Sequence, residues 1–389
     1  MDEESRLIRA GAGRKPTAKT VSPAIQRGST VLLPNARALY DGTFGYGRSG
    51  LNTQHALCEA LCELEGAREV QLFPSGLAAV TAALLAVLKA GDHVLVVDTV
   101  YKPVRQFCDS VLTRFGVAVD YYDARLDAPA LLALATPATR AILLESPGSL
   151  TFEIQDVPAI AAAARARGIL TIMDNTWGAG LLFKPLAKGV DISVQALTKY
   201  VCGHSDVFMG SVAVTDRGLA ATMEDAIHDH GWAVTGDDAY QALRGLRTLA
   251  VRMARHGENG LAVATWLQEQ PQVLRVIHPA LPGDAGHGLW TRDFSGANGL
   301  FAVVLKPGPN TAVAAFLDAL KLFGLGYSWG GFESLAINGD PQFKRRRVRI
   351  DYGGPVIRLH VGLESPADLI ADLEGALGAY GTVSGASFD

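Results

Sequence analysis

Four short stretches of the sequence place reactive side chains where buried strands or helices are expected to begin or end. Lys199 follows the apolar run ISVQALT, and Asp174 closes the run ILTIMD. Tyr101 follows the run HVLVVD, and the stretch FPSGL leads into a helix expected to begin near Gly76. A charged group in a buried position loses hydration that only a partner can replace. We therefore expect these groups to meet, with partners, at one edge of a sheet.

Together the four stretches supply what pyridoxal 5'-phosphate needs. A lysine can form a Schiff base with its aldehyde, and an acid can partner its pyridinium nitrogen. A helix N-terminus with free backbone N–H groups binds phosphate, and an aromatic ring can stack on the pyridine. Lys199 lies 25 residues after Asp174, about the length of one helix-and-strand unit. Residue types and spacing thus predict a pyridoxal-phosphate site.

Other interpretations of single motifs stay open. Asp174 could cap a helix, since Asp is a good N-cap residue. Residues 45–50 (GYGRSG) match a dinucleotide-binding pattern, but no apolar strand precedes them. His228 and His230 have no third ligand spaced near them, so no metal site is expected. The basic run KRRRVR at 344–349 is expected to be a solvated loop.

The composition is that of a folded protein and argues against several classes. The chain has 389 residues, of which 49% are hydrophobic, and a formal net charge of −4. This balance argues against binding nucleic acid through bulk charge. The apolar run at 77–88 is shorter than the ~20 residues that a membrane span needs, and the polar N-terminal segment is unlike a signal peptide. The four cysteines show no zinc or redox spacing. We expect a cytoplasmic protein that binds neither nucleic acid nor membrane.

The elements that must position the reactive residues alternate regularly after residue 50. Apolar runs separated by Ala-rich helical segments predict a mainly parallel α/β sheet covered on both faces, with ligands at the carboxyl ends of its strands. A long helix is expected from 238 to 270. The expected strands lie at 93–98, 117–123, 141–146, 169–174, 192–198 and 211–215. The expected parts are an N-terminal arm (1–50), a cofactor-binding domain (51–245) and a smaller C-terminal α/β domain (246–389).

From these residues outward the sequence resembles the Cys/Met-metabolism family of pyridoxal-phosphate enzymes. The resemblance covers about 44 to 375, through phrases such as LFPSGLAAV, GDHVLVVDTVYKP, LLESPGSLTFEIQDVPAI, IMDNTWGAG, TKYVCGHSD, YSWGGFESL and IRLHVGLE. It implies the aspartate-aminotransferase-like fold (pyridoxal-phosphate fold type I), with a mainly parallel seven-stranded sheet. It also implies a homotetramer, a dimer of dimers whose subunits share active sites.

Carried over position by position, the resemblance implies a role for each cofactor residue. Lys199 holds the cofactor, Asp174 pairs with its ring nitrogen and Tyr101 stacks on the ring. Lys199 and Tyr101 are the implied catalytic residues. The implied phosphate ligands are the amides of Gly76 and Leu77, the hydroxyl of Thr198 and, from a neighbouring subunit, Tyr46 and Arg48.

The resemblance also implies the substrate contacts and the reaction. Arg358 binds the substrate α-carboxylate, helped by Ser328 and Trp329 of the phrase YSWGG. Within the family the sequence is most similar to the bacterial cystathionine β-lyases, which implies a carbon–sulfur β-lyase of methionine biosynthesis acting on a small sulfur amino acid. Alternatives are a β-lyase for cysteine, cystine or S-alkylcysteines, a γ-acting relative, and a non-enzymatic regulator with this fold.

Two positions depart from the family pattern. Ala196 stands where many relatives have a serine, which removes one possible phosphate ligand. Ser49 stands directly after Arg48, where bacterial cystathionine β-lyases commonly carry a second arginine. The residue that meets the distal end of the substrate is therefore left open.

Overall fold

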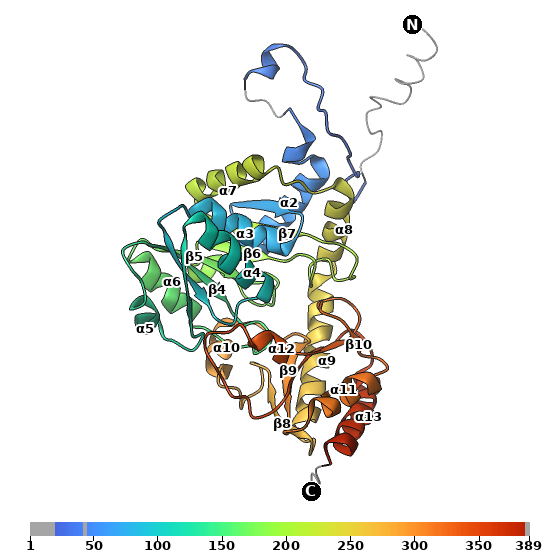
Figure 1. Cartoon of the computed structure of the whole chain (residues 1–389). Coiled ribbons are helices and arrows are strands. Elements are labelled where there is room, and N and C mark those ends of the chain that lie inside the picture. The colour runs from blue at the N-terminus through green and yellow to red at the C-terminus, as the bar shows by residue number, and fades with distance from the viewer. Residues whose placement is uncertain (1–19, 42–44, 386–389) are drawn as a thin grey trace.

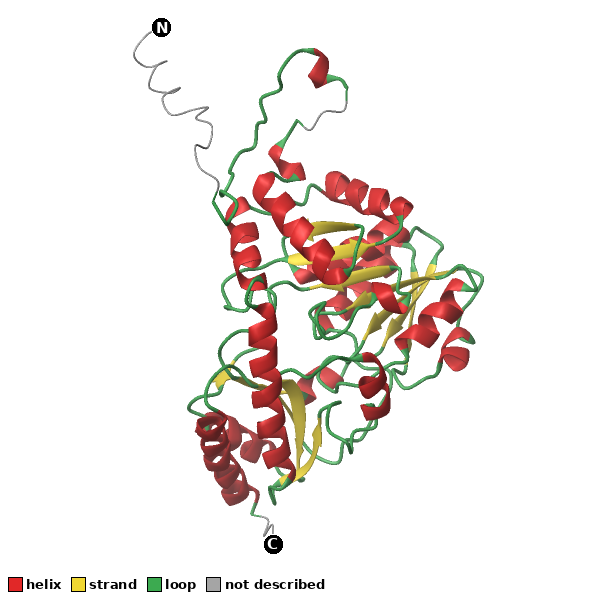
Figure 2. Ribbon diagram, turned by 180° about the vertical axis from the view of Figure 1, so that it is seen from behind, coloured by secondary structure: helices red, strands yellow, loops and turns green. Residues whose placement is uncertain are grey.

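The chain folds around two β-sheets, one above the other in Figure 1, with a long helix running between them. The structure is a computed structural model and describes residues 20–41 and 45–385. Residues 20–41 form an arm that extends away from the body, and Figure 2 shows the same arrangement from behind. Among the described helices, none combines the length and the apolar character needed to cross a membrane. The division at residues 50 and 245 stays a prediction.

The larger sheet has seven strands in the order β1-β7-β6-β5-β4-β2-β3. The five neighbouring strands β6, β5, β4, β2 and β3 pair in parallel, whereas β7 runs antiparallel to β6 and to β1. The predicted α/β fold with a mainly parallel sheet is confirmed. The strands are β1 Glu69–Phe73, β2 His93–Val97, β3 Ala118–Tyr122, β4 Thr139–Glu145, β5 Leu170–Asp174, β6 Ile192–Gln195 and β7 Gly210–Val214.

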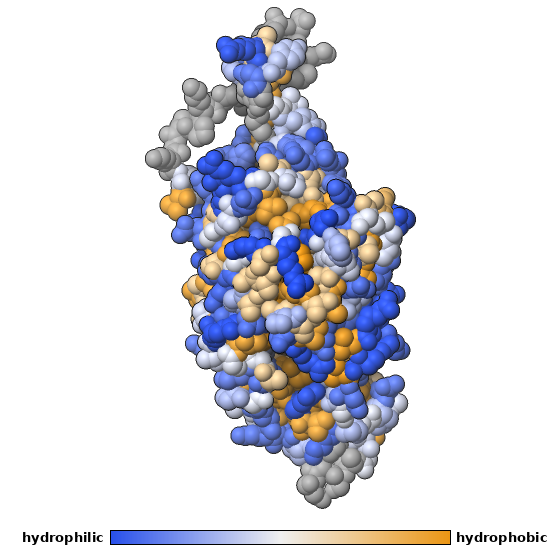
Figure 3. Space-filling model, turned by 90° about the vertical axis from the view of Figure 1, so that its left-hand side faces the viewer, coloured by the Kyte–Doolittle hydropathy of each residue, from blue (hydrophilic) through white to orange (hydrophobic). Residues whose placement is uncertain are grey.

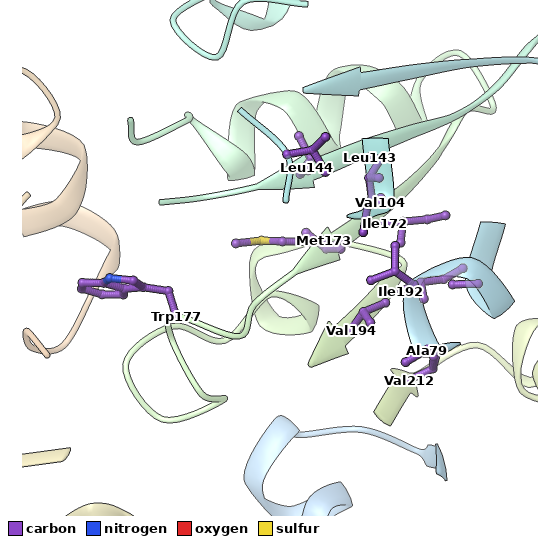
Figure 4. Close-up of a cluster of buried hydrophobic side chains, with 14 of the residues drawn as sticks. Ala79, Val104, Leu143, Leu144, Ile172, Met173, Trp177, Ile192, Val194 and Val212 are labelled. Atoms are coloured by element: carbon purple, nitrogen blue, oxygen red, sulfur yellow. The ribbon is translucent and has the colours of Figure 1, made fainter. Parts of the chain in front are cut away.

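Helices cover both faces of this sheet (Figures 1 and 2), so every residue of its strands β2 and β6 is buried. Figure 4 shows side chains from β4, β5, β6 and β7 gathered with Ala79 and Val104 of two covering helices. Trp177 points away from this cluster, and its indole N–H donates to the Leu300 carbonyl of the second sheet at 3.1 Å. The helices are α2 Asn52–Glu65, α3 Gly76–Val87, α4 Lys102–Phe107, α5 Ala128–Leu132, α6 Val157–Arg165 and α7 Arg217–His230.

The long helix expected at 238–270 is in fact two helices, α8 (Gly236–Leu246) and α9 (Leu249–Gln268). The turn between them is fixed by the buried side chain of Arg252. Its guanidinium donates to the carbonyls of Gly245 at the end of α8 and of Tyr200 and Val201 after Lys199. The break therefore depends on a contact with a distant loop, which helix periodicity does not reveal.

The second sheet has five strands in the order β10-β11-β12-β9-β8 and is antiparallel except for the pair β10–β11. Together with its helices it forms the C-terminal α/β part that was expected. The strands are β8 Val273–Ile277, β9 Leu300–Leu305, β10 Gly324–Leu325, β11 Leu335–Asn338 and β12 Val356–His360. The helices are α10 His287–Asp293, α11 Asn310–Ala319, α12 Asp340–Phe343 and α13 Pro366–Ser384.

The strand expected at 192–198 is shorter than predicted, because β6 ends at Gln195. The next backbone N–H, of Ala196, donates to the Thr176 hydroxyl at 2.9 Å instead of to the neighbouring strand. The Thr198 hydroxyl exchanges hydrogen bonds with the backbone of Met209. Lys199 therefore lies in a turn beyond the strand, at the carboxyl edge of the sheet.

Candidate active site

A cavity of about 340 Å³ lies where β4, β5 and β6 end, between the larger sheet and residues from the second sheet. It gathers most of the predicted site residues. Ser328 also reaches it, through a hydrogen bond to Lys199. The predicted residues that line the cavity are Gly76, Leu77, Tyr101, Asp174, Thr198, Lys199, Trp329 and Arg358.

Lys199 is largely enclosed by this cavity. Its ammonium donates to the Ser328 hydroxyl at 2.9 Å and lies 5.5 Å from the centre of the Trp329 ring. Burial, and then the positive charge of Arg358, lower the pKa of the Lys199 amine to about 8, although Asp174 acts in the opposite direction. A substantial fraction of the amine is therefore neutral near physiological pH and able to accept a proton.

Asp174 is the last residue of β5, and its carboxylate is held by the next turn. It accepts hydrogen bonds from the Thr176 backbone N–H at 2.9 Å and from the Thr176 hydroxyl at 2.5 Å. Burial raises the pKa of Asp174, while these bonds and Lys199 oppose the rise. The bonds use one carboxylate oxygen, Oδ1, so the second oxygen is available to a partner in the cavity.

Glu145 is a cavity residue that the sequence reasoning missed. It ends β4 directly opposite Asp174 in the strand register. Its carboxyl accepts the Tyr101 backbone N–H at 2.8 Å, and burial, followed by Asp174, raises its pKa well above the usual value. The signal that could have revealed Glu145 is a carboxyl group at the end of a buried strand, which is the signal that pointed to Asp174.

The first turn of α3 presents its backbone amides to the cavity. The Ser75 hydroxyl caps the helix by accepting the Ala78 N–H at 3.1 Å, and Gly76 and Leu77 line the cavity beside it. A Cβ on Gly76 would collide with the side chain of Ala196. Glycine therefore lets the helix N-terminus approach the turn after β6, and this tight cradle suits a phosphate.

The Thr198 hydroxyl borders the cradle but is already engaged. It donates to the Met209 carbonyl at 3.1 Å and accepts the Met209 N–H at 2.9 Å. A phosphate contact from this hydroxyl would have to share or replace the bond to the carbonyl. Its predicted role as a phosphate ligand stays a prediction.

Arg358 enters the cavity from β12 of the second sheet. Its terminal nitrogens donate to the backbone carbonyls of residues 326–328 at 2.9 to 3.1 Å. Its buried Nε meets no acceptor among the described residues. Burial lowers the pKa of Arg358 to about 10, so the group stays cationic at neutral pH. A charged donor without an acceptor suits a substrate carboxylate.

The YSWGG loop sits directly on the backbone of Lys199. Gly330 has φ +83°, and a Cβ there would lie 2.8 Å from the Tyr200 nitrogen. Its N–H donates to the buried His360 ring at 2.9 Å, and burial lowers the pKa of that imidazole well below its usual value. A neutral ring can accept this bond, and it fixes Ser328 and Trp329 over the lysine.

Tyr46 and Arg48 do not line the cavity that contains Lys199. They lie close to each other, with the Arg48 guanidinium 5.2 Å from the centre of the Tyr46 ring. Both border a different cavity, formed with residues 26–29 and the start of α8. Within one chain, these two predicted phosphate ligands are therefore separate from the other site residues.

The fold and the cavity together define an enzyme class. A seven-stranded sheet with a lysine, a strand-end aspartate and an open helix N-terminus at one edge is the arrangement of a pyridoxal-phosphate-dependent enzyme of fold type I. The crystal structure of metB from Corynebacterium glutamicum has the same fold, with a TM-score of 0.88 at 29% identity, covering 96% of this chain and 97% of that chain.

Sequence comparison identifies the family. The chain belongs to the family of Cys/Met metabolism PLP-dependent enzymes, whose model matches residues 4–378. A protein of Rhizobium johnstonii is 48% identical over 369 residues, which cover 93% of this chain and 92% of the relative. Cystathionine beta-lyase MetC of Escherichia coli (strain K12) is 44% identical over 384 residues, 95% of this chain and 97% of the relative. The predicted family and cofactor are confirmed.

Proposed function

We propose that this protein is a cystathionine β-lyase, which converts cystathionine and water to homocysteine, pyruvate and ammonia. The observation that carries the proposal is one cavity that combines Lys199, Asp174 and the cationic Arg358. Similarity to a relative named for this activity supports the choice of reaction. The reaction would serve methionine biosynthesis, and we place it in the cytoplasm.

The cavity residues fit pyridoxal phosphate. The tight contact between Gly76 and Ala196 leaves the α3 amides facing the space a phosphate would fill. The free oxygen of Asp174 would accept the ring N–H, and Lys199 would hold the aldehyde end. Tyr101, which is 46% exposed in a single chain, would cover one face of the ring. When bound, the cofactor supplies an electron sink for the electron pair left on the substrate Cα.

The substrate would be oriented by its α-carboxylate. Three of the five N–H groups of Arg358 hold the loop of Ser328 and Trp329, and its buried Nε–H has no described acceptor. A charge-assisted contact to this arginine fixes which bond of Cα faces Lys199. The arginine thereby connects substrate recognition with proton transfer.

Once the substrate amine had displaced Lys199 from the cofactor, the freed lysine would act as the base. Its Nζ accepts the proton from Cα, because a pKa of about 8 leaves part of the amine neutral at physiological pH. The Cβ–S bond then breaks with its electrons on sulfur, and homocysteine leaves. The remaining three-carbon unit takes up water and is released as pyruvate and ammonia. The pKa of the Tyr101 hydroxyl is raised, first by burial and then by Glu145, so this hydroxyl keeps its proton.

We further propose a homotetramer, a dimer of dimers in which the arm completes a neighbour's site. Among the described residues that line the cavity, the cations are Lys199 and Arg358, and both already have roles. A phosphate dianion in the α3 cradle therefore needs a further cation, and Arg48 on the arm side is the candidate. The arm also exposes large apolar side chains, among them Val21, Leu32 and Tyr40.

Apolar surface is not confined to the arm. Figure 3 shows several hydrophobic patches between hydrophilic ones on one face of the body. Exposed apolar area of this kind is typical of surfaces that meet a partner. A second copy of the chain is the partner that the proposed assembly requires.

A second candidate is a β-lyase with a broader choice of leaving group. Ser49 offers a neutral hydroxyl at the position that follows Arg48. A neutral hydroxyl binds a distal carboxylate more weakly than an arginine does. Cystine and S-alkylcysteines would then compete better with cystathionine.

Product analysis tests the proposal. The purified enzyme, loaded with cofactor, is incubated with cystathionine, cystine, cysteine and S-methylcysteine. We expect pyruvate from β-elimination, with cystathionine giving the highest kcat/KM. Production of 2-oxobutyrate in place of pyruvate would assign a γ-acting enzyme. Absence of both products, with cofactor bound, would contradict lyase activity altogether.

A further inference from the structure

The basic run at 344–349 is not the solvated loop that its composition predicts. Arg346 is 8% exposed, although its neighbours Arg345 and Arg347 are exposed. The run directly follows α12, which lies between the two sheets in Figure 1. A buried arginine is tolerated where its donors find acceptors. The contacts of this segment therefore indicate what it is for.

Arg346 binds a loop of the larger sheet. Its guanidinium donates to the Ser149 carbonyl at 2.6 Å and to the Thr151 hydroxyl at 2.9 Å. It also donates to the Tyr352 hydroxyl at 3.2 Å and lies 4.7 Å from the centre of the Phe343 ring. Two contacts anchor the side chain in its own segment, and two hold a loop nearly two hundred residues earlier in the sequence.

That loop, residues 147–152, forms part of the cavity wall around Lys199. Two of its residues have left-handed backbone conformations that are unfavourable for side chains with a Cβ, Leu150 with φ +69° and Phe152 with φ +56°. Such conformations persist where surrounding contacts enforce them. Phe152 is buried in the core and also lines a second cavity, so the hydrogen bonds from Arg346 add to the packing that holds the loop.

The same segment holds a second part of the wall. The Asp98 carboxylate accepts the backbone N–H groups of Arg347 and Val348, each at 2.9 Å, and is itself paired with the buried Arg105 at 2.5 Å. Residues 98–101 lead from β2 to Tyr101, and the Thr99 carbonyl accepts the Ser149 N–H at 3.0 Å. The two wall loops are therefore bonded to each other and to one segment of the C-terminal part.

We propose that residues 346–348 form a clamp that sets the shape of the catalytic cavity, with Arg346 as a positioning residue for substrate binding. The clamp joins the 98–101 and 147–152 loops from behind, where neither substrate nor cofactor reaches. The activity assay below depends on the proposed lyase function, whereas the contacts that support the clamp do not.

The test compares Arg346→Met and Arg346→Lys with the matched control Arg345→Met. Removing the guanidinium should free the 147–152 loop and raise the KM for cystathionine about tenfold, because small misplacements in a site are costly. The kcat per bound cofactor should stay within about threefold, since Lys199 and Asp174 are untouched. The KM of Arg346→Lys should lie between those of Arg346→Met and the wild type, and the KM of Arg345→Met should match the wild type.

A second variant separates positioning from general stability. Thr151→Val removes one acceptor of the Arg346 guanidinium while keeping the side-chain shape. It should raise KM in the same direction. The effects of Arg346→Lys and Thr151→Val should be less than additive, because both variants lose the Arg346–Thr151 bond, whereas only Thr151→Val also loses the bond that the Thr151 hydroxyl donates to Glu153 at 2.6 Å. These milder changes decide the question if Arg346→Met does not fold.

A binding measurement tests the clamp independently of the lyase reaction. Glycine, an amino acid with no leaving group, is titrated while the absorbance of the bound cofactor is followed. Weaker glycine binding in the Arg346 variants, with the same cofactor content and melting temperature, supports the clamp even if the wild type releases no pyruvate. Folded Arg346→Met protein with unchanged KM and glycine affinity overturns it, as do additive effects of Arg346→Lys and Thr151→Val.

Discussion

Replacement of Arg358 by lysine is the substitution whose outcome the structure defines best. The arginine uses its terminal nitrogens on three carbonyls of residues 326–328 and keeps a buried Nε without a described acceptor. A lysine has a single nitrogen and cannot reach the three loop carbonyls while also donating to a carboxylate. The loss of the carboxylate contact is worth roughly 1.5–3 kcal/mol, which corresponds to about a 10- to 150-fold decrease in kcat/KM.

The change should raise KM, because the carboxylate contact exists before the reaction, and it should also lower kcat, because the same contact orients Cα toward Lys199. The assay measures pyruvate release from cystathionine, together with cofactor absorbance to show that the site is still loaded. Arg345→Lys, at an exposed position, is the control. An amine that lacks the carboxylate should bind the wild type and Arg358→Lys equally. A KM within about threefold of the wild type would refute the assigned role of Arg358.

Four other outcomes are expected. Lys199→Ala should lose nearly all pyruvate release, and residual activity above a few per cent of wild type would rule out its role as base. Asp174→Asn should keep the cofactor but lower kcat by about 100-fold or more, because an amide cannot stabilise a charged ring nitrogen; an unchanged kcat would show that another group does so. Mixed subunits of Arg48→Ala and Lys199→Ala should recover part of the activity, because one hybrid site has both native residues, and no recovery after demonstrated subunit exchange would argue against a shared site. Ser49→Arg should shift the kcat/KM ratio of cystathionine to S-methylcysteine by about tenfold, whereas an unchanged ratio would show that this position does not contact the leaving group.

Site residues at strand ends could be predicted because the carboxyl ends of parallel strands meet at one edge of the sheet, where ligands bind. Asp174 and Lys199 were found by this rule, and the rule also applied to Glu145, whose strand ends in register with Asp174. The expected strand at 141–146 placed Glu145 one residue before its end, whereas β4 in fact ends at Glu145. The edge strand β1 was missed because its polar residues Glu69 and Gln71 interrupt the apolar pattern.

Contacts between distant segments could not be predicted from local patterns. In the run KRRRVR every cation favours solvent, and Arg346 is buried only because Ser149 and Thr151 accept its donors. The break between α8 and α9 likewise depends on Arg252, a residue that by type belongs on a helix surface. Both cases involve an arginine that satisfies backbone carbonyls of another segment, which periodicity and propensity do not encode.

The bonds from Arg252 to the carbonyls of Tyr200 and Val201 have a consequence for the order of biosynthesis. A chain that emerges from the ribosome presents Lys199 before Arg252, and both before Arg358. Until α9 docks, the turn that carries the lysine lacks the guanidinium that satisfies its carbonyls. We therefore expect the turn that carries Lys199 to reach its final arrangement only after α9 has been made and has packed against the sheet.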